Sequence, residues 1–127
     1  MKLEHTALNV PDPKAQANWM VEHLGLKLVR DLGEPTFITF VADNDGALLE
    51  LYKNPKADIP DYFQISPYTL HLAFTTDDLD TTKAGLLAAG ASDTGIAETL
   101  PNGDTYVFLH DPWGLSIQLI KRVAPIL

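Results

Sequence analysis

The stretch LHLAFTTDDLD, residues 70–80, decides the fold, because it joins a strand pattern directly to a helix start. Its apolar residues alternate with polar or small ones, which is typical of a strand with one buried face. The aspartates and the apolar residue that follow are typical of a capped helix N-terminus. Residues 3–13, LEHTALNVPDP, have the same order, so the arrangement occurs twice in the chain.

The separation between matched residues supports an internal repeat rather than a chance likeness. Four pairs keep nearly the same spacing: His5 and His71 are 66 positions apart, Asp12 and Asp78 are 66 apart, Gly25 and Gly90 are 65 apart, and Glu50 and Gln118 are 68 apart. Because helix caps, helix stops and polar strand residues all agree, we expect two equivalent halves.

Each half is predicted to have the order βαβββ, which makes the fold class α+β. The first half is expected to contain a strand at 2–10, a helix at 11–25 and strands at 26–32, 36–42 and 47–53. The second is expected to contain a strand at 68–76, a helix at 77–90 and strands at 92–99, 105–111 and 114–122. The sequence thus predicts one domain over 1–127, with module one at about 1–54, a proline-rich linker at about 55–66 and module two at about 67–122.

Composition narrows the function classes. The chain has 127 residues, a net charge of −8 and no cysteine. An acidic chain lacks the positive surface that binds phosphate backbones, so no nucleic-acid partner is expected. The absence of cysteine excludes disulfides and thiolate metal sites. No segment has the length of a membrane span or the pattern of a signal peptide, so we expect no membrane partner and a cytoplasmic location.

Four polar side chains occupy matched places in the repeat. His5, Glu50, His71 and Gln118 each alternate with apolar residues of their own strand, so they point away from the rows that would receive the helices. Alone, each has a structural explanation, such as a hydrogen-bonded histidine or a solvent-exposed amide. Together, two imidazoles, a carboxylate and an amide oxygen indicate a site for a divalent ion.

The segments LEHTALNVPDP, EHLGLKLVRD, ALLELYKN, LHLAFTTDDLD and HDPWGLSIQLI resemble the vicinal oxygen chelate superfamily, which includes glyoxalase I, bleomycin-resistance proteins and extradiol dioxygenases. The resemblance covers essentially the whole chain and implies paired βαβββ modules that form an open half-barrel around a metal and substrate cleft. It also implies that His5, Glu50, His71 and Gln118 are the metal ligands. Bacterial glyoxalase I typically has His, Glu, His and Glu there, so Gln118 departs from the pattern.

The resemblance implies a glyoxalase-like, metal-dependent lyase or isomerase that acts on a small substrate with vicinal oxygens, as lactoylglutathione lyase does. Glu50 is then the candidate catalytic base, because Gln118 cannot accept a proton. The cofactor would be Zn, Ni, Co, Mn or Fe, held weakly because only one ligand is anionic. The alternatives are a metal-free small-molecule binding protein of the bleomycin-resistance type and, ranked lower, a ring-cleavage dioxygenase-like enzyme.

Aromatic and polar strand residues are the expected substrate contacts. These are Phe37, Thr39, Tyr52, Tyr106 and Phe108. No basic cluster marks a clamp for a substrate carboxylate, and the nearest cations in the sequence are Lys53, Lys56, Lys121 and Arg122. Open sheet edges favour pairing with a second copy, so a homodimer is expected, with the site completed in one chain or across the dimer.

Overall fold

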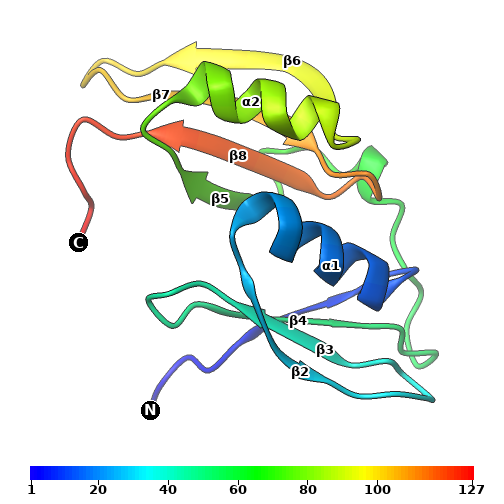
Figure 1. Ribbon diagram of the computed structural model, residues 1–127. Helices are drawn as coiled ribbons and strands as arrows, with labels where there is room; N and C mark the ends of the chain where they lie inside the picture. Colours follow the sequence, from blue (N-terminus) through cyan, green and yellow to red (C-terminus); the bar gives the residue numbers. More distant parts are fainter. The chain divides into compact units, whose positions relative to one another are not determined.

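The computed structural model describes residues 1–127, which form two compact units, Met1–Pro60 and Asp61–Leu127. We call these units module one and module two. Each contains one helix lying along one face of a four-stranded mixed sheet (Figure 1). Neither helix has the length and hydrophobicity needed to cross a membrane.

Module one has the predicted order βαβββ. It consists of β1 (Thr6–Asn9), α1 (Pro13–Leu24), β2 (Lys27–Asp31), β3 (Thr39–Ala42) and β4 (Leu48–Tyr52), and the strands lie in the order β1-β4-β3-β2. β1 runs parallel to β4, whereas β4, β3 and β2 pair antiparallel. The Asp12 carboxylate caps α1 by accepting the Ala15 N–H, and Gly25 ends the helix with a φ of 72°.

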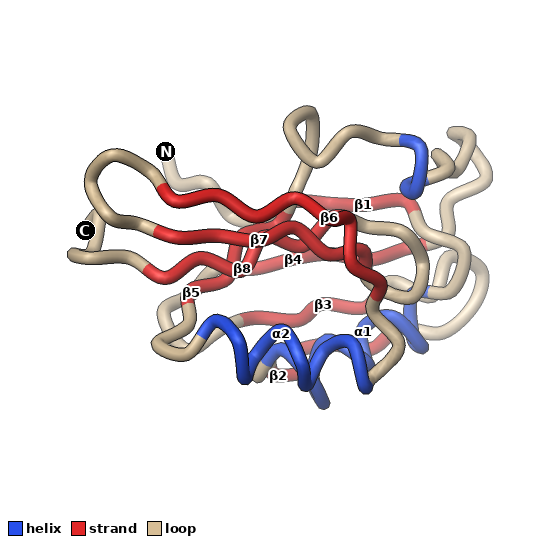
Figure 2. The backbone as a smooth tube through the Cα atoms, turned by 90° about the horizontal axis from the view of Figure 1, so that it is seen from above, coloured by secondary structure: helices blue, strands red, loops and turns tan.

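Module two repeats this topology. After a short 3₁₀ turn, η1 (Tyr62–Gln64), come β5 (Leu72–Thr75), α2 (Leu79–Ala88), β6 (Ser92–Thr99), β7 (Thr105–His110) and β8 (Ser116–Lys121). The strand order β5-β8-β7-β6 is that of module one, with β5 parallel to β8. Asp78 caps α2 through the Thr81 N–H, and Gly90 follows the helix with a φ of 103°. Figure 2 marks the helices and strands along the backbone by colour.

The predicted α+β class and the paired βαβββ modules are confirmed. The strands are shorter than predicted, because β1 and β5 begin only where they meet β4 and β8, one residue after His5 and His71. The strand expected at 36–42 begins at Thr39, since Phe37 has a φ of 51°, which a regular strand does not allow.

One face of each sheet forms the core beneath the helix. In module one, Val41 and Leu51 on the sheet are fully buried, as is Met20 on α1. In module two, Ile117 and Leu109 on the sheet and Leu86 on α2 are at most 3% exposed. This burial fixes the strand register, because a slip by one residue would move each apolar row to the other face.

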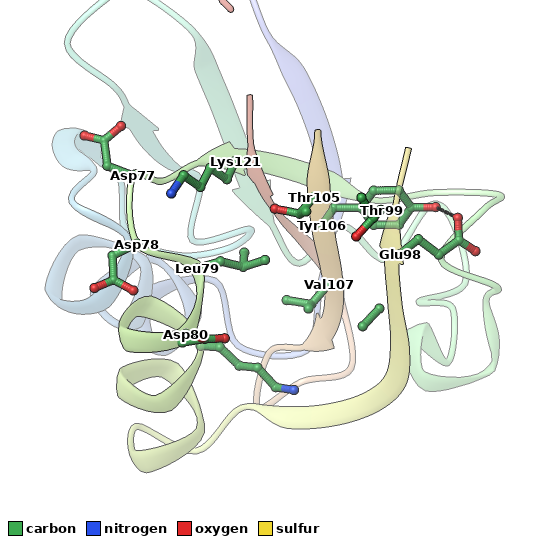
Figure 3. A pocket seen from close by; sticks show the side chains of 12 residues that line it. Asp77, Asp78, Leu79, Asp80, Glu98, Thr99, Thr105, Tyr106, Val107 and Lys121 are labelled. Carbon is green, nitrogen blue, oxygen red and sulfur yellow. Dashed lines mark hydrogen bonds between the residues drawn. The ribbon is translucent and has the colours of Figure 1, made fainter. Parts of the chain in front are cut away.

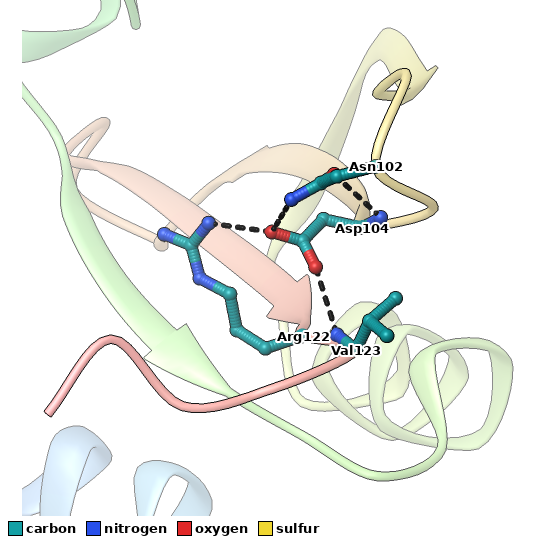
Figure 4. A network of polar contacts seen from close by, with 4 residues as sticks. All are labelled: Asn102, Asp104, Arg122 and Val123. Carbon is teal, nitrogen blue, oxygen red and sulfur yellow. Dashed lines mark hydrogen bonds and ion pairs between the residues drawn. The ribbon is translucent and has the colours of Figure 1, made fainter.

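A buried carboxylate ties the β6–β7 hairpin to the end of β8 (Figure 4). Asp104 is 3% exposed and accepts hydrogen bonds from the Val123 N–H at 2.8 Å, Arg122 Nη1 at 2.8 Å and Asn102 Nδ2 at 3.1 Å. Donation from Val123, then from Arg122 and Asn102, holds the pKa of Asp104 below its usual value. The network thereby holds the chain just after β8 against the turn between β6 and β7.

Candidate functional site

The polar residues on the face away from each helix occupy equivalent places in the two sheets. Glu50 lies between Ala7 of β1 and Phe40 of β3. In module two, Gln118 lies between Ala73 of β5 and Phe108 of β7. Because residues directly opposite each other share a face, each module has one such row: alanine, carboxylate or amide, and phenylalanine.

The two histidines stand in equivalent positions beside these rows. Each precedes its alanine by two residues, and each contacts the phenylalanine of its own module in a T-shaped arrangement. The ring centroids of His5 and Phe40 are 5.7 Å apart, and those of His71 and Phe108 are 5.1 Å apart. Of the predicted ligands, His5 and Glu50 are in contact, whereas His71 and Gln118 each lie beside Phe108.

Both histidines use Nδ1 for contacts with protein oxygens. His71 Nδ1 lies 2.7 Å from the Pro67 carbonyl oxygen, so Nδ1 donates, and in the neutral imidazole Nε2 has the lone pair. His5 Nδ1 lies 3.0 Å from a carboxylate oxygen of Glu4. An oxygen acceptor at one ring nitrogen, which orients the other, is the usual support of a metal-binding histidine.

In module one the imidazole of His5 lies within ion-pair distance of the carboxylate of Glu50. His5 Nε2 lies 3.2 Å from Glu50 Oε2, and the side chain of Glu50 is only 13% exposed. A lone pair and a carboxylate oxygen repel each other at this distance unless a proton or a cation lies between them. Metal–ligand bonds of about 2.1 Å place neighbouring ligand atoms roughly 3.0–3.4 Å apart in octahedral or tetrahedral coordination. The donors present therefore fit a divalent ion.

The pair in module two is neutral. Gln118 is half-buried between Ala73 and Phe108 and offers an amide oxygen where Glu50 offers a carboxylate. No three histidine, aspartate or glutamate side chains gather into a metal-binding cluster within either module. Each module by itself thus supplies two of the four predicted ligands, which is too few to hold a transition metal firmly.

The predicted substrate contacts of module one are divided between three environments. Tyr52 shares the face of Glu50, next to Asn9. Thr39 lies opposite Leu51 on the other face, is 1% exposed, and donates its hydroxyl to the Phe37 carbonyl. Phe37 lines a separate hollow of about 480 Å³ beside the segment that follows β4. Of the three, only Tyr52 lies beside the His5–Glu50 pair.

The predicted contacts of module two lie together on the Gln118 face. Phe108 is 1% exposed, and its ring meets those of Tyr106 at 5.3 Å and Tyr68 at 5.4 Å. The Tyr106 hydroxyl donates to Glu98 Oε2 at 2.5 Å, and the Tyr68 hydroxyl donates to Glu98 Oε1 at 3.2 Å. The bond to Glu98 and burial raise the pKa of Tyr106 to about 12. Sequence reasoning missed Glu98, because a single acid in a mostly exposed strand carries no signal.

The cavity of about 690 Å³ in module two lies on the opposite side of the sheet, between the sheet and the start of α2 (Figure 3). Leu79, Val107 and Lys121 line it, and Tyr106 and Glu98 meet on the side away from α2. The cavity combines carboxylates at the start of α2 with two lysines, and Tyr106, a predicted substrate contact, and Glu98 also belong to its lining.

The comparisons with known proteins now define the class. The family model of the Glyoxalase/Bleomycin resistance protein/Dioxygenase superfamily matches residues 2–119, so the chain belongs to this superfamily. The family resemblance expected from the sequence is thereby confirmed.

Individual relatives agree with this assignment. A lactoylglutathione lyase of Haemophilus influenzae is 30% identical over 129 residues, which cover 96% of this chain and 93% of the relative. A glyoxalase family protein of Bacillus cereus has a similar structure, with a TM-score of 0.79 at 17% identity over 98% of this chain and 95% of its own. An antibiotic binding protein of Streptomyces has a TM-score of 0.69 at 24% identity, over 95% of each chain.

Proposed function

We propose that this protein is a glyoxalase-like, metal-dependent lyase or isomerase that acts on a small substrate with vicinal oxygens. The observation that carries the proposal is the approach of His5 Nε2 to Glu50 Oε2 at 3.2 Å, on the same sheet face as Phe40. The lactoylglutathione lyases among the relatives support the same reaction class.

In this proposal His5, Glu50, His71 and Gln118 together bind one divalent ion, either from one chain or from two chains of a homodimer. A bound Zn, Ni, Co, Mn or Fe ion would act as a Lewis acid toward the substrate oxygens. One carboxylate, two imidazoles and one amide leave a net positive charge at the site, so metal retention is weak and depends on the free ion concentration.

Glu50 is the only group of the four that can take a proton from one substrate carbon and return it to its neighbour. Its side chain is only 13% exposed. Gln118 accepts no proton and serves as a neutral ligand. Phe40 and Phe108 hold the histidines in place by ring contact, and Tyr52, Tyr106 and Phe108 form the walls nearest the polar pairs.

The alternative is a metal-free small-molecule binding protein. The neutral amide at Gln118 favours it, and so does the name of the antibiotic binding protein among the structural neighbours. A ring-cleavage dioxygenase-like enzyme ranks below both. The dioxygenases of the superfamily have a carboxylate at the position of Gln118, where this chain has an amide.

Metal content decides between these functions. The protein should be purified without a nickel column or chelator, and its metal content measured. Wild-type protein loaded in turn with Zn²⁺, Ni²⁺, Co²⁺, Mn²⁺ and Fe²⁺ is then tested for a rise in melting temperature and for turnover of methylglyoxal hemithioacetals. We expect binding of about one ion per site and turnover with at least one metal.

Histidine variants provide the control. His71→Ala should abolish metal uptake while the circular dichroism spectrum stays native. His23→Ala should leave uptake unchanged, since His23 lies on α1 against Trp19 and Glu22. Equal metal binding by wild type and His71→Ala would reject the metal site, and a metal-loaded protein without turnover would leave the binding function in its place.

A further inference from the structure

Tyr68 lies across the polar face of the module two sheet. It precedes β5, at one edge of that sheet, yet its hydroxyl donates to Glu98 Oε1 on β6, the strand at the other edge, at 3.2 Å. Its ring also meets that of Phe108 on β7 at 5.4 Å in a T-shaped contact. Because Phe108 shares the face of Gln118, the Tyr68 side chain extends over that face toward β6.

Glu98 is a fixed partner for Tyr68, since a second phenol holds it. Its other carboxylate oxygen accepts the Tyr106 hydroxyl at 2.5 Å (Figure 3). Tyr106 is 8% exposed and packs against Phe108. A hydrogen bond to a carboxylate is stronger than one between neutral groups. The exposed Tyr68 side chain is thereby tied to the buried part of the sheet.

The peptide unit that joins Pro67 to Tyr68 is held at both ends. Its N–H, from Tyr68, donates to Ser66 Oγ at 3.2 Å, and its carbonyl oxygen, from Pro67, lies 2.7 Å from His71 Nδ1. The next two N–H groups along the chain both donate to the Ser66 carbonyl, at 2.9 and 3.2 Å. A peptide unit is planar and proline fixes its own φ, so this turn moves together with Tyr68.

His5 has no comparable support in module one. The oxygen at its Nδ1 comes from Glu4, the adjacent residue, whose side chain is 73% exposed. A long exposed side chain keeps much of its rotamer freedom, so it orients a partner less firmly than a backbone carbonyl does. Of the two candidate histidine ligands, His71 is therefore the one that the fold orients, and Tyr68 belongs to the turn that does so.

We propose that Tyr68 and Glu98 are positioning residues for His71. Their hydrogen bond keeps the Pro67 carbonyl against Nδ1, so the ring carries its proton there and offers the Nε2 lone pair to a metal ion. This inference rests on the proposed function and adds two residues to it, neither of which is itself a ligand. Gln118 brings no charge to this half of the site, so metal binding here depends on the orientation of the histidine.

A hydrogen bond that only stabilises the loop before β5 makes a different prediction. Its loss would lower the melting temperature and leave the ring of His71 unchanged in the folded protein. Loss of a positioning hydrogen bond changes the tautomer of His71 and the metal affinity while the protein stays folded.

Nuclear magnetic resonance of the histidine rings tests the proposal in metal-free protein. Long-range proton–nitrogen spectra at about pH 9, where histidine rings are neutral, distinguish protonation at Nδ1 from protonation at Nε2. The spectrum of His71→Ala assigns the signals. We expect wild-type His71 to be protonated at Nδ1, and we expect the Nε2-protonated form to appear in Tyr68→Phe and in Glu98→Ala. Tyr68→Phe keeps the ring beside Phe108 and loses only the hydroxyl.

Affinity for Zn²⁺, measured by competition with a chelating dye, is the second readout. Tyr68→Phe and Glu98→Ala should each weaken binding about tenfold, at the lower end of the effect of groups that support metal ligands. The double variant should bind no more weakly than Glu98→Ala, because both changes remove the same hydrogen bond. Asp80→Ala is the control, since it removes a carboxylate from α2 of the same module. It should leave the His71 tautomer and the affinity unchanged.

The positioning role is overturned if the wild-type His71 ring is protonated at Nε2, or if Tyr68→Phe retains the wild-type tautomer, whatever its affinity. Equal changes in Asp80→Ala would also overturn it. Tyr68 is 62% exposed, so Tyr68→Phe should fold, which circular dichroism verifies. Wild-type protein that binds no Zn²⁺ would reject the proposed metal site, and the tautomers of wild type and Tyr68→Phe would still decide whether Tyr68 orients His71.

Discussion

Glu50 and Gln118 occupy the same place in their two sheets, each between an alanine on one side and a phenylalanine on the other. The backbone therefore treats them alike, and only the side-chain chemistry differs. A carboxylate carries a full negative charge and can accept a proton, whereas an amide does neither.

Exchanging these two groups tests which of them performs the chemistry. Glu50→Gln should lower turnover of the metal-loaded enzyme by about 10²–10⁴-fold, the usual contribution of a positioned base. Gln118→Glu should keep or raise turnover on a hemithioacetal, because it adds a second carboxylate in an equivalent position. Steady-state kinetics and metal content should be measured on the same preparations. A Glu50→Gln variant with wild-type turnover would remove Glu50 from the mechanism.

Gly114 should tolerate no side chain. It has a φ of 96°, and a Cβ there would lie 2.5 Å from Phe63 Cδ2 and 2.6 Å from the Phe63 backbone nitrogen. Gly114→Ala should therefore lower the free energy of unfolding by about 3 kcal/mol, from left-handed strain together with overpacking. Urea denaturation measures the change.

Gly95 separates the two causes. Its φ is 81°, yet a Cβ there would meet nothing within 4 Å. Gly95→Ala should cost about 1 kcal/mol, from backbone strain alone. Equal losses at Gly95 and Gly114 would show that Phe63 moves aside and adds no penalty.

Tyr106 should make stability depend on pH in the alkaline range. Its pKa is raised from 10.0 to about 12, because its hydroxyl donates to Glu98. The folded state thus holds this proton more tightly than the unfolded chain, so the contribution is complete below pH 10 and is lost between pH 10 and 12. Tyr106→Phe should remove that part of the slope in urea titrations. It should also delete the latest phenolate step in the ultraviolet titration, which Tyr68→Phe should not.

Asp104 should make stability depend on pH in the acid range. Its pKa is lowered, chiefly by the Val123 N–H, so its contribution is present above the unfolded value of 3.8 and is lost as pH falls below it. Asp104→Asn should lower the urea midpoint at pH 7 and flatten the acid limb of the stability curve. Asp78 and Asp93, whose pKa values are also lowered, should retain the rest of that limb.

The parts of the fold that local chemistry dictates could be predicted from the sequence. Asp12 and Gly25 set the two ends of α1, and the repeat spacing predicted the second module. The face of Glu50 followed from alternation, because its neighbours Leu49 and Leu51 are both buried.

The other features of the fold depend on strand partners and long-range contacts, which the alternation of apolar residues does not specify. Thr39 lies in a run that is apolar on both faces, so its position under α1 became visible only through its pairing with Leu51. Gly114 is readable as a turn residue, but the close approach of Phe63 is a long-range contact. The β-bulge in β2 was not predicted: Leu28 lies opposite Val41 and Arg30 opposite Phe40, so Val29 is an extra residue between them.

Because Val29 is an unpaired extra residue in β2, this strand can lose one residue without a change in its pairing. A homologue without Val29 would keep Leu28 opposite Val41 and the next residue, the arginine, opposite Phe40, in a straight strand with lysine and arginine two positions apart. Removal of this one residue therefore leaves every paired side chain of β2 on its present face.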